Sequence, residues 1–210
     1  MGFKTMFKTG IRRSGRGVKE ELNQEERMYV VENQKITIER EIIGQRILDI
    51  GGGGEGVIGL CYGNRVVAID PRKDELEEAP DGPLKIVMDA RELSFLENSF
   101  DAVTSFFTML YIDNGDHEKV FKEIYRVLKD NGEFVLWDTT IPEYDGGMKD
   151  IFVIQLQIST PVKEIKTGYG VSRKDKAQDI EYFVEIGKNL GFEVVKEQVK
   201  DKIFKIIFRK

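Results

Sequence analysis

The chain has 210 residues, of which 40% are hydrophobic and 33% are charged. This composition describes a globular protein and excludes an intrinsically disordered chain, a collagen-like repeat and a polytopic membrane protein. The net charge of −5 gives no overall attraction to nucleic acid or anionic lipid. The single cysteine, Cys61, and the single histidine, His117, exclude a disulfide framework, a multi-cysteine zinc site and a histidine-rich metal site, so no bound metal is expected.

The N-terminal region differs in composition from the rest of the chain. Residues 1–19 contain lysine, arginine and glycine but no acidic residue, which predicts a flexible basic arm; a lid or a contact for an anionic substrate are the alternatives. Acidic and apolar residues at 20–33 predict an amphipathic helix. Because the sequence has neither an apolar span nor the apolar core of a secretion signal, we expect a cytoplasmic protein.

Short apolar runs follow in the middle of the chain. Five have strand length, at residues 46–50, 65–69, 84–88, 101–106 and 133–138, and four of them lack a polar face. Strands buried on both sides are typical of a parallel sheet. Residues 117–129 place five apolar side chains on one helical face, and Asp130–Gly132 predict the turn that ends this helix. Alternating strands and helices predict an α/β doubly wound sheet.

The alternation ends after residue 138. Residues 139–147 are loop-like, and residues 154–158 alternate as in a strand with one exposed face. The spacing of Ser172 and Asp175 predicts a capping box that opens a helix, which Gly191 ends. Residues 192–199 and 203–208 predict an antiparallel hairpin. No repeat or linker divides the chain, so we expect one domain over residues 1–210.

The segment ILDIGGGGEG at 47–56 takes a buried strand into four consecutive glycines. Without Cβ atoms, such a turn adopts positive φ and lets a ligand lie against backbone N–H groups. The start of a following helix would add partial positive charge, and ligands of open α/β sheets bind at this end of the strands. A tight turn without a ligand is the alternative. The glycines, with Asp70 nineteen residues after Gly51, also fit the dinucleotide fingerprint.

Three acidic residues lie at the ends of three successive predicted strands. Asp49 lies near the end of the first strand, Asp70 ends the second, and Asp89 ends the third. At the position of Asp70, a ribose diol can use both carboxylate oxygens. Asp89 and the N–H of Ala90 are placed to bind the edge of an adenine ring. Asp49 would repel a pyrophosphate and attract a cation, so the set favours a cationic ligand.

Five segments in order now resemble the motifs of the class I S-adenosylmethionine-dependent methyltransferases. They are LDIGGGGEG, AIDPRKDEL, MDARELSF, FDAVTSFFTMLYI and EIYRVLKDNGEFVLWD. The resemblance covers residues 46–138 motif by motif and the terminal hairpin in outline. It implies a Rossmann-like doubly wound seven-stranded sheet, mostly parallel, with a C-terminal antiparallel hairpin. It also implies S-adenosylmethionine as cofactor, S-adenosylhomocysteine as product, residues 1–45 as an N-terminal arm and helix, and residues 139–171 as a substrate-side insertion.

The resemblance also implies cofactor contacts by position. The glycines would line the methionine end, Asp49 would orient the loop or the cofactor amino group, and Asp70 would accept the ribose hydroxyls. The full implied set is Asp49, Gly51, Gly52, Gly53, Asp70, Pro71, Asp89, Ala90, Ser105 and Phe106. Two residues depart from the family pattern: Glu55 replaces the third motif glycine, which is displaced to Gly56, and Pro71 replaces an aliphatic residue.

Methyl transfer from a sulfonium requires alignment of donor and acceptor, and a base only where the acceptor carries a proton when it attacks. By position the candidate catalytic residues are Tyr111, Asp138 and Tyr144, with ordinary loop or core roles as the competing interpretation. We expect His117 at the surface near a helix cap and Cys61 in the core.

The acceptor must be inferred from the segments outside the shared motifs. Residues 105–108 lack the Asn/Asp-Pro-Pro-Tyr signature used on DNA adenine and protein glutamine, and no nucleic-acid-binding module is present, so DNA is not expected. Residues 1–45 and 139–171 contain aromatic residues expected to be exposed (Phe3, Phe7, Tyr144 and Tyr169), which favours a small-molecule acceptor. The alternatives are an RNA or protein methyltransferase, with the basic arm holding the polymer, and a non-catalytic adenosyl- or dinucleotide-binding domain. The acceptor-side segments are also a candidate homodimer interface.

Overall fold

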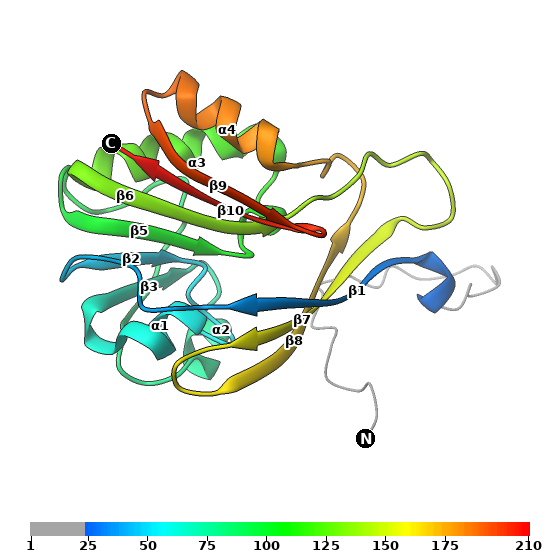
Figure 1. Ribbon diagram of the computed structural model, residues 1–210, viewed down its shortest axis with the longest axis horizontal. Helices are drawn as coiled ribbons and strands as arrows, with labels where there is room; N and C mark the ends of the chain where they lie inside the picture. Colours follow the sequence, from blue (N-terminus) through cyan, green and yellow to red (C-terminus); the bar gives the residue numbers. More distant parts are fainter. Residues whose placement is uncertain (1–23) are drawn as a thin grey trace.

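The computed structural model describes residues 24–210, so the basic arm at 1–19 lies outside the described residues. The central sheet has seven strands in the order β4-β3-β2-β5-β6-β10-β9 (Figure 1). They are β2 (Ile47–Ile50), β3 (Val66–Asp70), β4 (Leu84–Val87), β5 (Phe100–Phe106), β6 (Leu128–Thr139), β9 (Glu193–Lys200) and β10 (Ile203–Arg209). The first five are parallel, and β10 is antiparallel to both β6 and β9. The predicted mostly parallel sheet with its C-terminal hairpin is confirmed.

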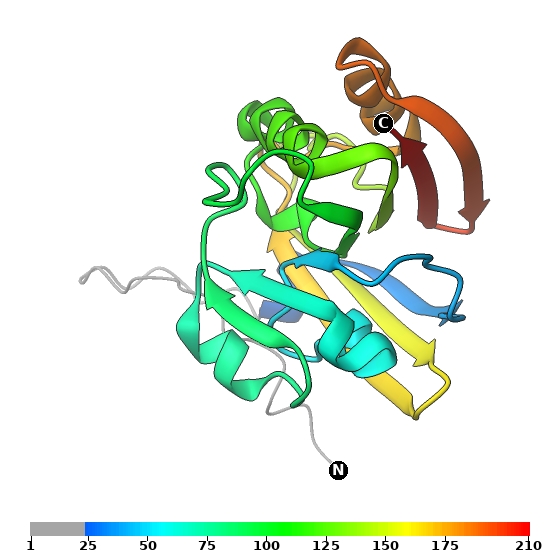
Figure 2. The same ribbon diagram turned by 90° about the vertical axis from the view of Figure 1, so that its left-hand side faces the viewer.

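Helices and a second sheet cover the two faces of the central sheet (Figures 1 and 2). The helices α3 (Asn114–Val127) and α4 (Ile180–Asn189) lie on one face. On the other face lie α1 (Val57–Tyr62), α2 (Lys73–Glu78) and a three-stranded sheet of order β1-β7-β8, with β1 (Met28–Thr37), β7 (Ile151–Ser159) and β8 (Glu164–Ser172). Short 3-10 turns are present at Gln24–Arg27, Gly63–Arg65 and Met109–Tyr111. None of the helices in the described part of the chain is long and apolar enough to cross a membrane.

Each face of the central sheet has its own hydrophobic core, because successive strand residues point to opposite faces. Leu48 and Ile50 pack with α3 and α4, whereas Ile47 packs with α1 and the small sheet. On the helical side, five phenylalanine rings contact one another at centroid separations from 5.2 to 6.4 Å: Phe121, Phe134, Phe183, Phe192 and Phe208. These aromatic contacts fix α3, α4 and the terminal hairpin against the sheet.

The helix predicted at 20–33 is wrong over its described part. Residues 24–27 form one 3-10 turn, and β1 begins at Met28 and pairs in parallel with β7. The side chains of Val31 and Ile36 are buried in the core, and the Tyr29 ring stacks on Phe152. Pairing with a strand far along the chain outweighs the local helical preference of the glutamate-rich sequence.

The helix α3 begins at Asn114 and ends at Val127, because the residue that follows already belongs to β6. The early start places His117 inside the helix, where it is fully buried and not at the surface as predicted. Its Nε2 lies 2.9 Å from the Met109 carbonyl oxygen, and its Nδ1 lies 3.1 Å from the Tyr182 hydroxyl. Burial lowers the pKa of His117, which therefore serves as a neutral bridge between α3, α4 and the loop after β5.

The start of α4 also differs from the prediction. Ser172 is the last residue of β8, and the helix is capped by Asp179, whose Oδ1 accepts the N–H of Tyr182 at 2.8 Å. The capping box predicted at Ser172 and Asp175 is therefore wrong. Cys61 is buried in the core, as predicted.

We expect two glycine substitutions in helices to have opposite effects. A Cβ at Gly187 in α4 would overlap the Phe208 ring, so Gly187→Ala should lower the free energy of unfolding by about 1–3 kcal/mol. A Cβ at Gly115 in α3 meets no atom within 4 Å, so Gly115→Ala should raise that free energy by up to about 1 kcal/mol. Urea denaturation of both variants measures the difference, and equal effects would contradict the packing seen at Gly187.

Candidate functional site

The glycine loop that follows β2 is held by backbone hydrogen bonds to two neighbouring elements. The N–H groups of Gly51 and Gly52 both donate to the Ile69 carbonyl in β3, at 2.9 and 3.0 Å. The N–H of Gly54 donates to the Glu75 carbonyl in α2 at 2.8 Å. Among residues 24–210 the Gly53 N–H has no hydrogen-bond acceptor, so the loop keeps one backbone donor for a ligand.

Three of the four glycines are required by close contact with other elements. A Cβ at Gly51, where φ is 72°, would overlap the Thr108 side chain. A Cβ at Gly52 would lie 2.7 Å from the Ala68 Cβ, and one at Gly53 would lie 2.6 Å from the Glu75 Cβ and 3.1 Å from Asp70 Oδ2. Any other side chain here would push the loop away from β3 and α2.

Asp49 occupies the strand end directly before this loop. Its side chain is 3% exposed, and its Oδ1 accepts a hydrogen bond of 2.7 Å from the Thr104 hydroxyl in β5. Burial raises the pKa of Asp49 from 3.8 to about 7; the Thr104 bond opposes the shift and the charge of Asp70 adds to it. A cation bound near Asp49 would stabilise the ionised carboxylate.

Asp70 lies at the end of the neighbouring strand β3. Its Oδ1 accepts the N–H of Arg72 at 2.8 Å, and burial raises the pKa of the carboxyl. Its Oδ2 is the oxygen that lies beside Gly53. The next residue, Pro71, is exposed at the same edge of the sheet. The free N–H of Gly53 and the carboxylate of Asp70 thus follow adjacent strands at the same edge of the sheet.

Asp89 follows β4 and is already held by an arginine. Arg91 donates to both oxygens of Asp89, at 2.6 to 3.1 Å, and its Nη1 donates to Asp116 of α3 at 2.8 Å. The Arg91 guanidinium lowers the pKa of Asp89, which is therefore a charged acceptor held in place. The side chain of Ala90 is buried beside it.

The end of β5 is packed against the glycine loop. Ser105 is fully buried, and its hydroxyl has no partner among the described residues. The Phe106 ring lies 5.0 Å from the Phe107 ring and 5.9 Å from the Trp137 ring. The Thr108 hydroxyl donates to the Ile50 carbonyl at 3.1 Å. The cofactor residues implied by the sequence therefore lie at the ends of four adjacent strands, β4, β3, β2 and β5.

A contact that the sequence did not predict joins the small sheet to the glycine loop. The Glu55 carboxylate accepts hydrogen bonds from the hydroxyls of Thr167 and Tyr169, both in β8, the latter at 3.2 Å. The Tyr169 ring stacks on Phe107 at 5.6 Å, so it is packed against the loop after β5 and is not the exposed aromatic expected from sequence. Burial and the Glu55 charge raise the pKa of Tyr169 well above its ordinary value, so its hydroxyl remains a donor. Glu55 stood out in the sequence only as a departure from the motif.

The three candidate catalytic residues occupy different environments. Asp138 is fully buried, accepts N–H bonds from Thr139 and Gln178, and has its pKa raised by burial to about 7. Tyr111 is about half exposed, and its ring packs edge-on against Tyr169 at 6.3 Å. Tyr144 lies in the loop after β6, and its hydroxyl donates to the Gly147 carbonyl at 2.7 Å.

Comparison with known proteins adds family information to this geometry. The family model for the methyltransferase domain matches residues 48–136. A demethylmenaquinone methyltransferase of Listeria welshimeri is 32% identical over 112 residues, which cover 52% of this chain and 45% of that protein. A sterol 4-C-methyltransferase of Caenorhabditis elegans is 31% identical over 96 residues, covering 46% and 28%. The chain thus spans less than half the length of these curated relatives.

Among solved structures, that of an S-adenosylmethionine-dependent methyltransferase from Methanosarcina mazei has the same fold. It superposes with a TM-score of 0.58 at 21% identity, over 80% of this chain and 94% of that one. The two chains therefore share the Rossmann-like fold. The match to the methyltransferase domain is confined to residues 48–136, fewer than half of the 210 residues of the chain.

The burial of Asp49 leads to a test of stability against pH. Because its folded-state pKa is raised, the contribution of Asp49 to the stability of the fold is greatest below about pH 4 and is lost as the pH rises through about 7. Asp49→Asn removes this ionisation, so the variant should match the wild type at pH 5 and exceed it at pH 8 by about 2 kcal/mol. Asp138 has a shift of the same sign, so the variant keeps part of the pH dependence.

Urea denaturation at the two pH values measures this difference. Asp81→Asn is the matched control, because Asp81 is exposed in the loop before β4 and should give the same small effect at both. An Asp49→Asn variant that is less stable than the wild type at pH 8 would contradict this expectation, because interactions in the fold would then offset the cost of burying the ionised carboxylate.

Proposed function

We propose that the protein binds S-adenosylmethionine at the glycine loop and transfers its methyl group to a small-molecule acceptor. The observation that carries the proposal is the position of the glycine loop, with its free Gly53 N–H, among the strand-end carboxyl groups of Asp49, Asp70 and Asp89. A ribose diol needs acceptors for two hydroxyl groups, and Asp70 offers a carboxylate at the strand position that ribose-binding acids occupy in folds of this kind.

The charge of the site favours a sulfonium ligand over a pyrophosphate. Asp49 and Asp70 are both at least half-buried, and their raised pKa values have burial as the main cause. A diphosphate near these carboxyls would add like charge, whereas a sulfonium and an ammonium group would add opposite charge. The Gly53 N–H, which has no acceptor among residues 24–210, supplies a backbone donor for such a ligand.

When bound, S-adenosylmethionine supplies a methyl group on a sulfonium whose departure needs no protonation. The contribution of the chain is then alignment and the exclusion of water. Asp70 and Asp89 would hold the adenosyl part, Asp49 would face the cationic part, and the Phe106 and Phe107 rings would close the site beside Trp137. Of the candidate catalytic residues, Asp138 is the one that could take a proton from an acceptor, whereas burial raises the pKa of Tyr111 and keeps its hydroxyl a donor.

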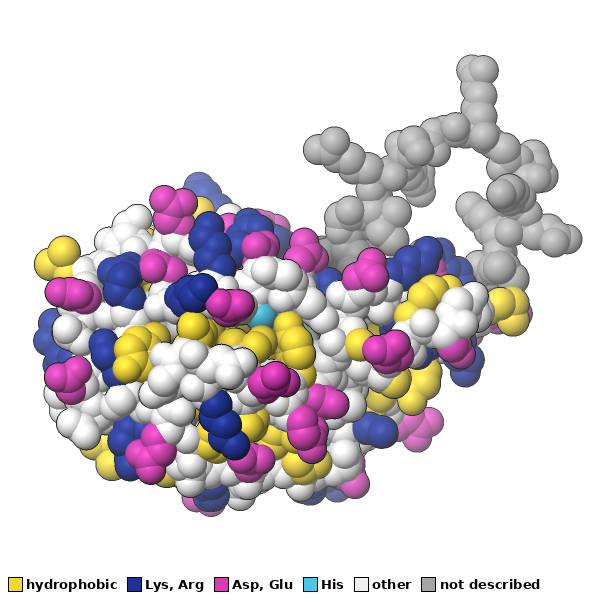
Figure 3. All heavy atoms as spheres, turned by 90° about the horizontal axis from the view of Figure 1, so that it is seen from above, with side chains coloured by type: hydrophobic (Ala, Val, Ile, Leu, Met, Phe, Trp, Pro, Cys, Tyr) yellow, Lys and Arg dark blue, Asp and Glu magenta, His cyan; other side chains and the backbone are white. Residues whose placement is uncertain are grey.

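Two observations support a small molecule as the acceptor. The related proteins from Listeria welshimeri and Caenorhabditis elegans are named for a quinone precursor and a sterol, both small molecules. On the face that carries α3 and α4, acidic and basic side chains are intermixed, without the single-sign patch that a nucleic acid requires (Figure 3).

Calorimetric titration with S-adenosylmethionine, S-adenosylhomocysteine and NAD tests the proposal. We expect both adenosyl ligands to bind with a dissociation constant of about 1–100 μM, and NAD not to bind. Asp70→Asn removes one charged acceptor for the ribose and should weaken both by about tenfold or more. The exposed residue Asp81 provides the control, and Asp81→Asn should bind as the wild type does. Binding of NAD alone would overturn the proposal.

A further inference from the structure

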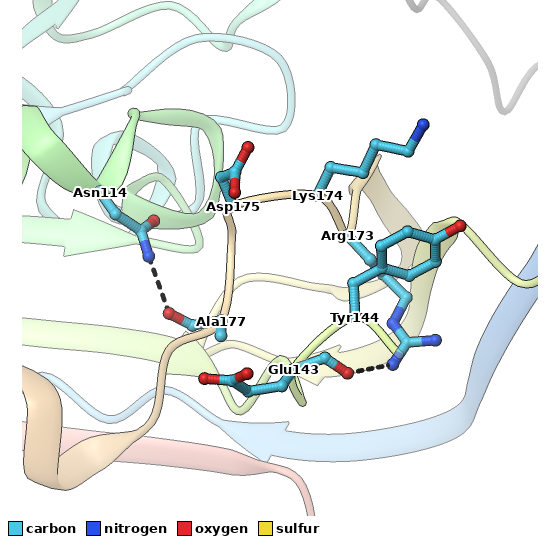
Figure 4. A pocket seen from close by; sticks show the side chains of 7 residues that line it. All are labelled: Asn114, Glu143, Tyr144, Arg173, Lys174, Asp175 and Ala177. Carbon is cyan, nitrogen blue, oxygen red and sulfur yellow. Dashed lines mark hydrogen bonds between the residues drawn. The ribbon is translucent and has the colours of Figure 1, made fainter. Parts of the chain in front are cut away.

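A hollow of about 500 Å³ opens beside the start of α3, where the loops that follow β6 and β8 meet (Figure 4). Its polar lining comes from the start of α3, the loop between β6 and β7, and the loop between β8 and α4: Asn114, Glu143, Tyr144, Arg173, Lys174 and Asp175. A hollow of this size suits a small organic molecule.

The charges of the hollow are divided between two walls. Arg173 and Lys174 lie beside the Tyr144 ring, whereas Glu143 and Asp175 lie on the side of Asn114 (Figure 4). Within the described part of the chain, the side chains of Glu143, Lys174 and Asp175 form no ion pair. A cationic wall therefore faces a carboxylate wall, and both have unused charge.

Arg173 provides an unpaired donor on the cationic wall. Its side chain is 5% exposed, and its two terminal nitrogens donate to backbone carbonyls, of Lys149 at 2.8 Å and of Glu143 at 2.7 Å. The guanidinium lies 4.8 Å from the Tyr29 ring and 5.7 Å from the Tyr144 ring. Among residues 24–210 no carboxylate pairs with it, and its buried Nε has no acceptor. A buried cation without an anion is costly, and a bound carboxylate would offset that cost.

Asn114 provides an unpaired acceptor on the other wall. Its Nδ2 donates to the Ala177 carbonyl at 2.8 Å, which fixes the orientation of the amide. Its Oδ1 is buried and receives no hydrogen bond from the described residues. An amide oxygen beside two carboxylates is a suitable partner for an ammonium group.

We infer that this hollow binds a small zwitterion of the amino-acid class. The carboxylate of the zwitterion faces Arg173 and Lys174, and its ammonium faces Glu143, Asp175 and the Asn114 Oδ1. A simple anion would meet the two carboxylates, and a simple cation would meet the two basic side chains, so neither satisfies both walls. The inference rests on the proposed function in one respect, because it takes the bound zwitterionic group to be part of the methyl acceptor.

The relatives give no guide to this ligand. The family model ends at residue 136, whereas most of the lining lies between residues 143 and 177. The family model therefore carries no information about most of the residues that line the hollow.

The test is calorimetric titration of the full chain, saturated with S-adenosylhomocysteine, with glycine, L-glutamate, L-lysine and L-phenylalanine. We expect at least one to bind with a dissociation constant below about 1 mM. The amide of that amino acid, which lacks the carboxylate, and its deaminated analogue, which lacks the ammonium, should each bind at least about tenfold more weakly. The inference is overturned if none of the four binds at concentrations up to about 10 mM.

Two variants connect binding to the walls of the hollow. Lys174→Gln and Glu143→Gln each remove one charge from an exposed side chain: Glu143 holds Arg173 through its backbone, and the Lys174 ammonium lies 5.9 Å from the Tyr144 ring. Each should weaken the amino acid about fivefold or more and leave the melting temperature unchanged. Lys163→Gln, in the exposed turn before β8, and Glu164→Gln, at the exposed start of β8, make the same charge changes and should have no effect. Equal weakening in all four variants would overturn the assignment to this hollow.

Titration with S-adenosylhomocysteine alone separates the two proposals. If it binds and no amino acid does, the inference fails and the methyltransferase proposal stands. If an amino acid binds and S-adenosylhomocysteine does not, the assignment of the zwitterion as acceptor fails together with the proposed function.

Discussion

The arrangement of the site depends on how closely the glycine loop approaches its neighbours. Two successive N–H groups, of Gly51 and Gly52, share the Ile69 carbonyl, and this shared bond draws the loop onto the end of β3. The approach is possible only because Gly51 and Gly52 have no Cβ atoms, since Thr108 and Ala68 occupy the space where those atoms would lie. This contact holds the loop, with its free Gly53 N–H, at the edge where the parallel strands end in carboxyl groups.

The same close packing disfavours the ionised form of two carboxyl groups at the site. Burial raises the pKa of Asp49 and of Asp70, so the fold is less stable with both ionised than it would be if they were solvated. A cationic ligand that binds only the folded protein recovers that loss and stabilises the fold by mass action. Ligand affinity and the pH dependence of stability therefore have a common origin in these carboxyl groups.

The sequence predicted the features that depend on local pattern. Strands buried on both sides show as apolar runs, and Gly51–Gly54, Asp49 and Asp70 lie within or directly after such runs, so their placement at one edge follows from parallel topology. The second sheet was not predictable in this way, because β1 becomes a strand only through pairing with β7, far along the chain. His117 was misplaced for a related reason, since its burial depends on Tyr182 of a different helix.

Glu55 shows why a departure from a motif is informative once the structure is known. In place of a glycine it puts a carboxylate on the loop, and this carboxylate holds the hydroxyls of Thr167 and Tyr169 in β8. The residue after β8 is Arg173, which forms the cationic wall of the hollow. One strand, β8, therefore connects the glycine loop, through Glu55, to the hollow, through Arg173.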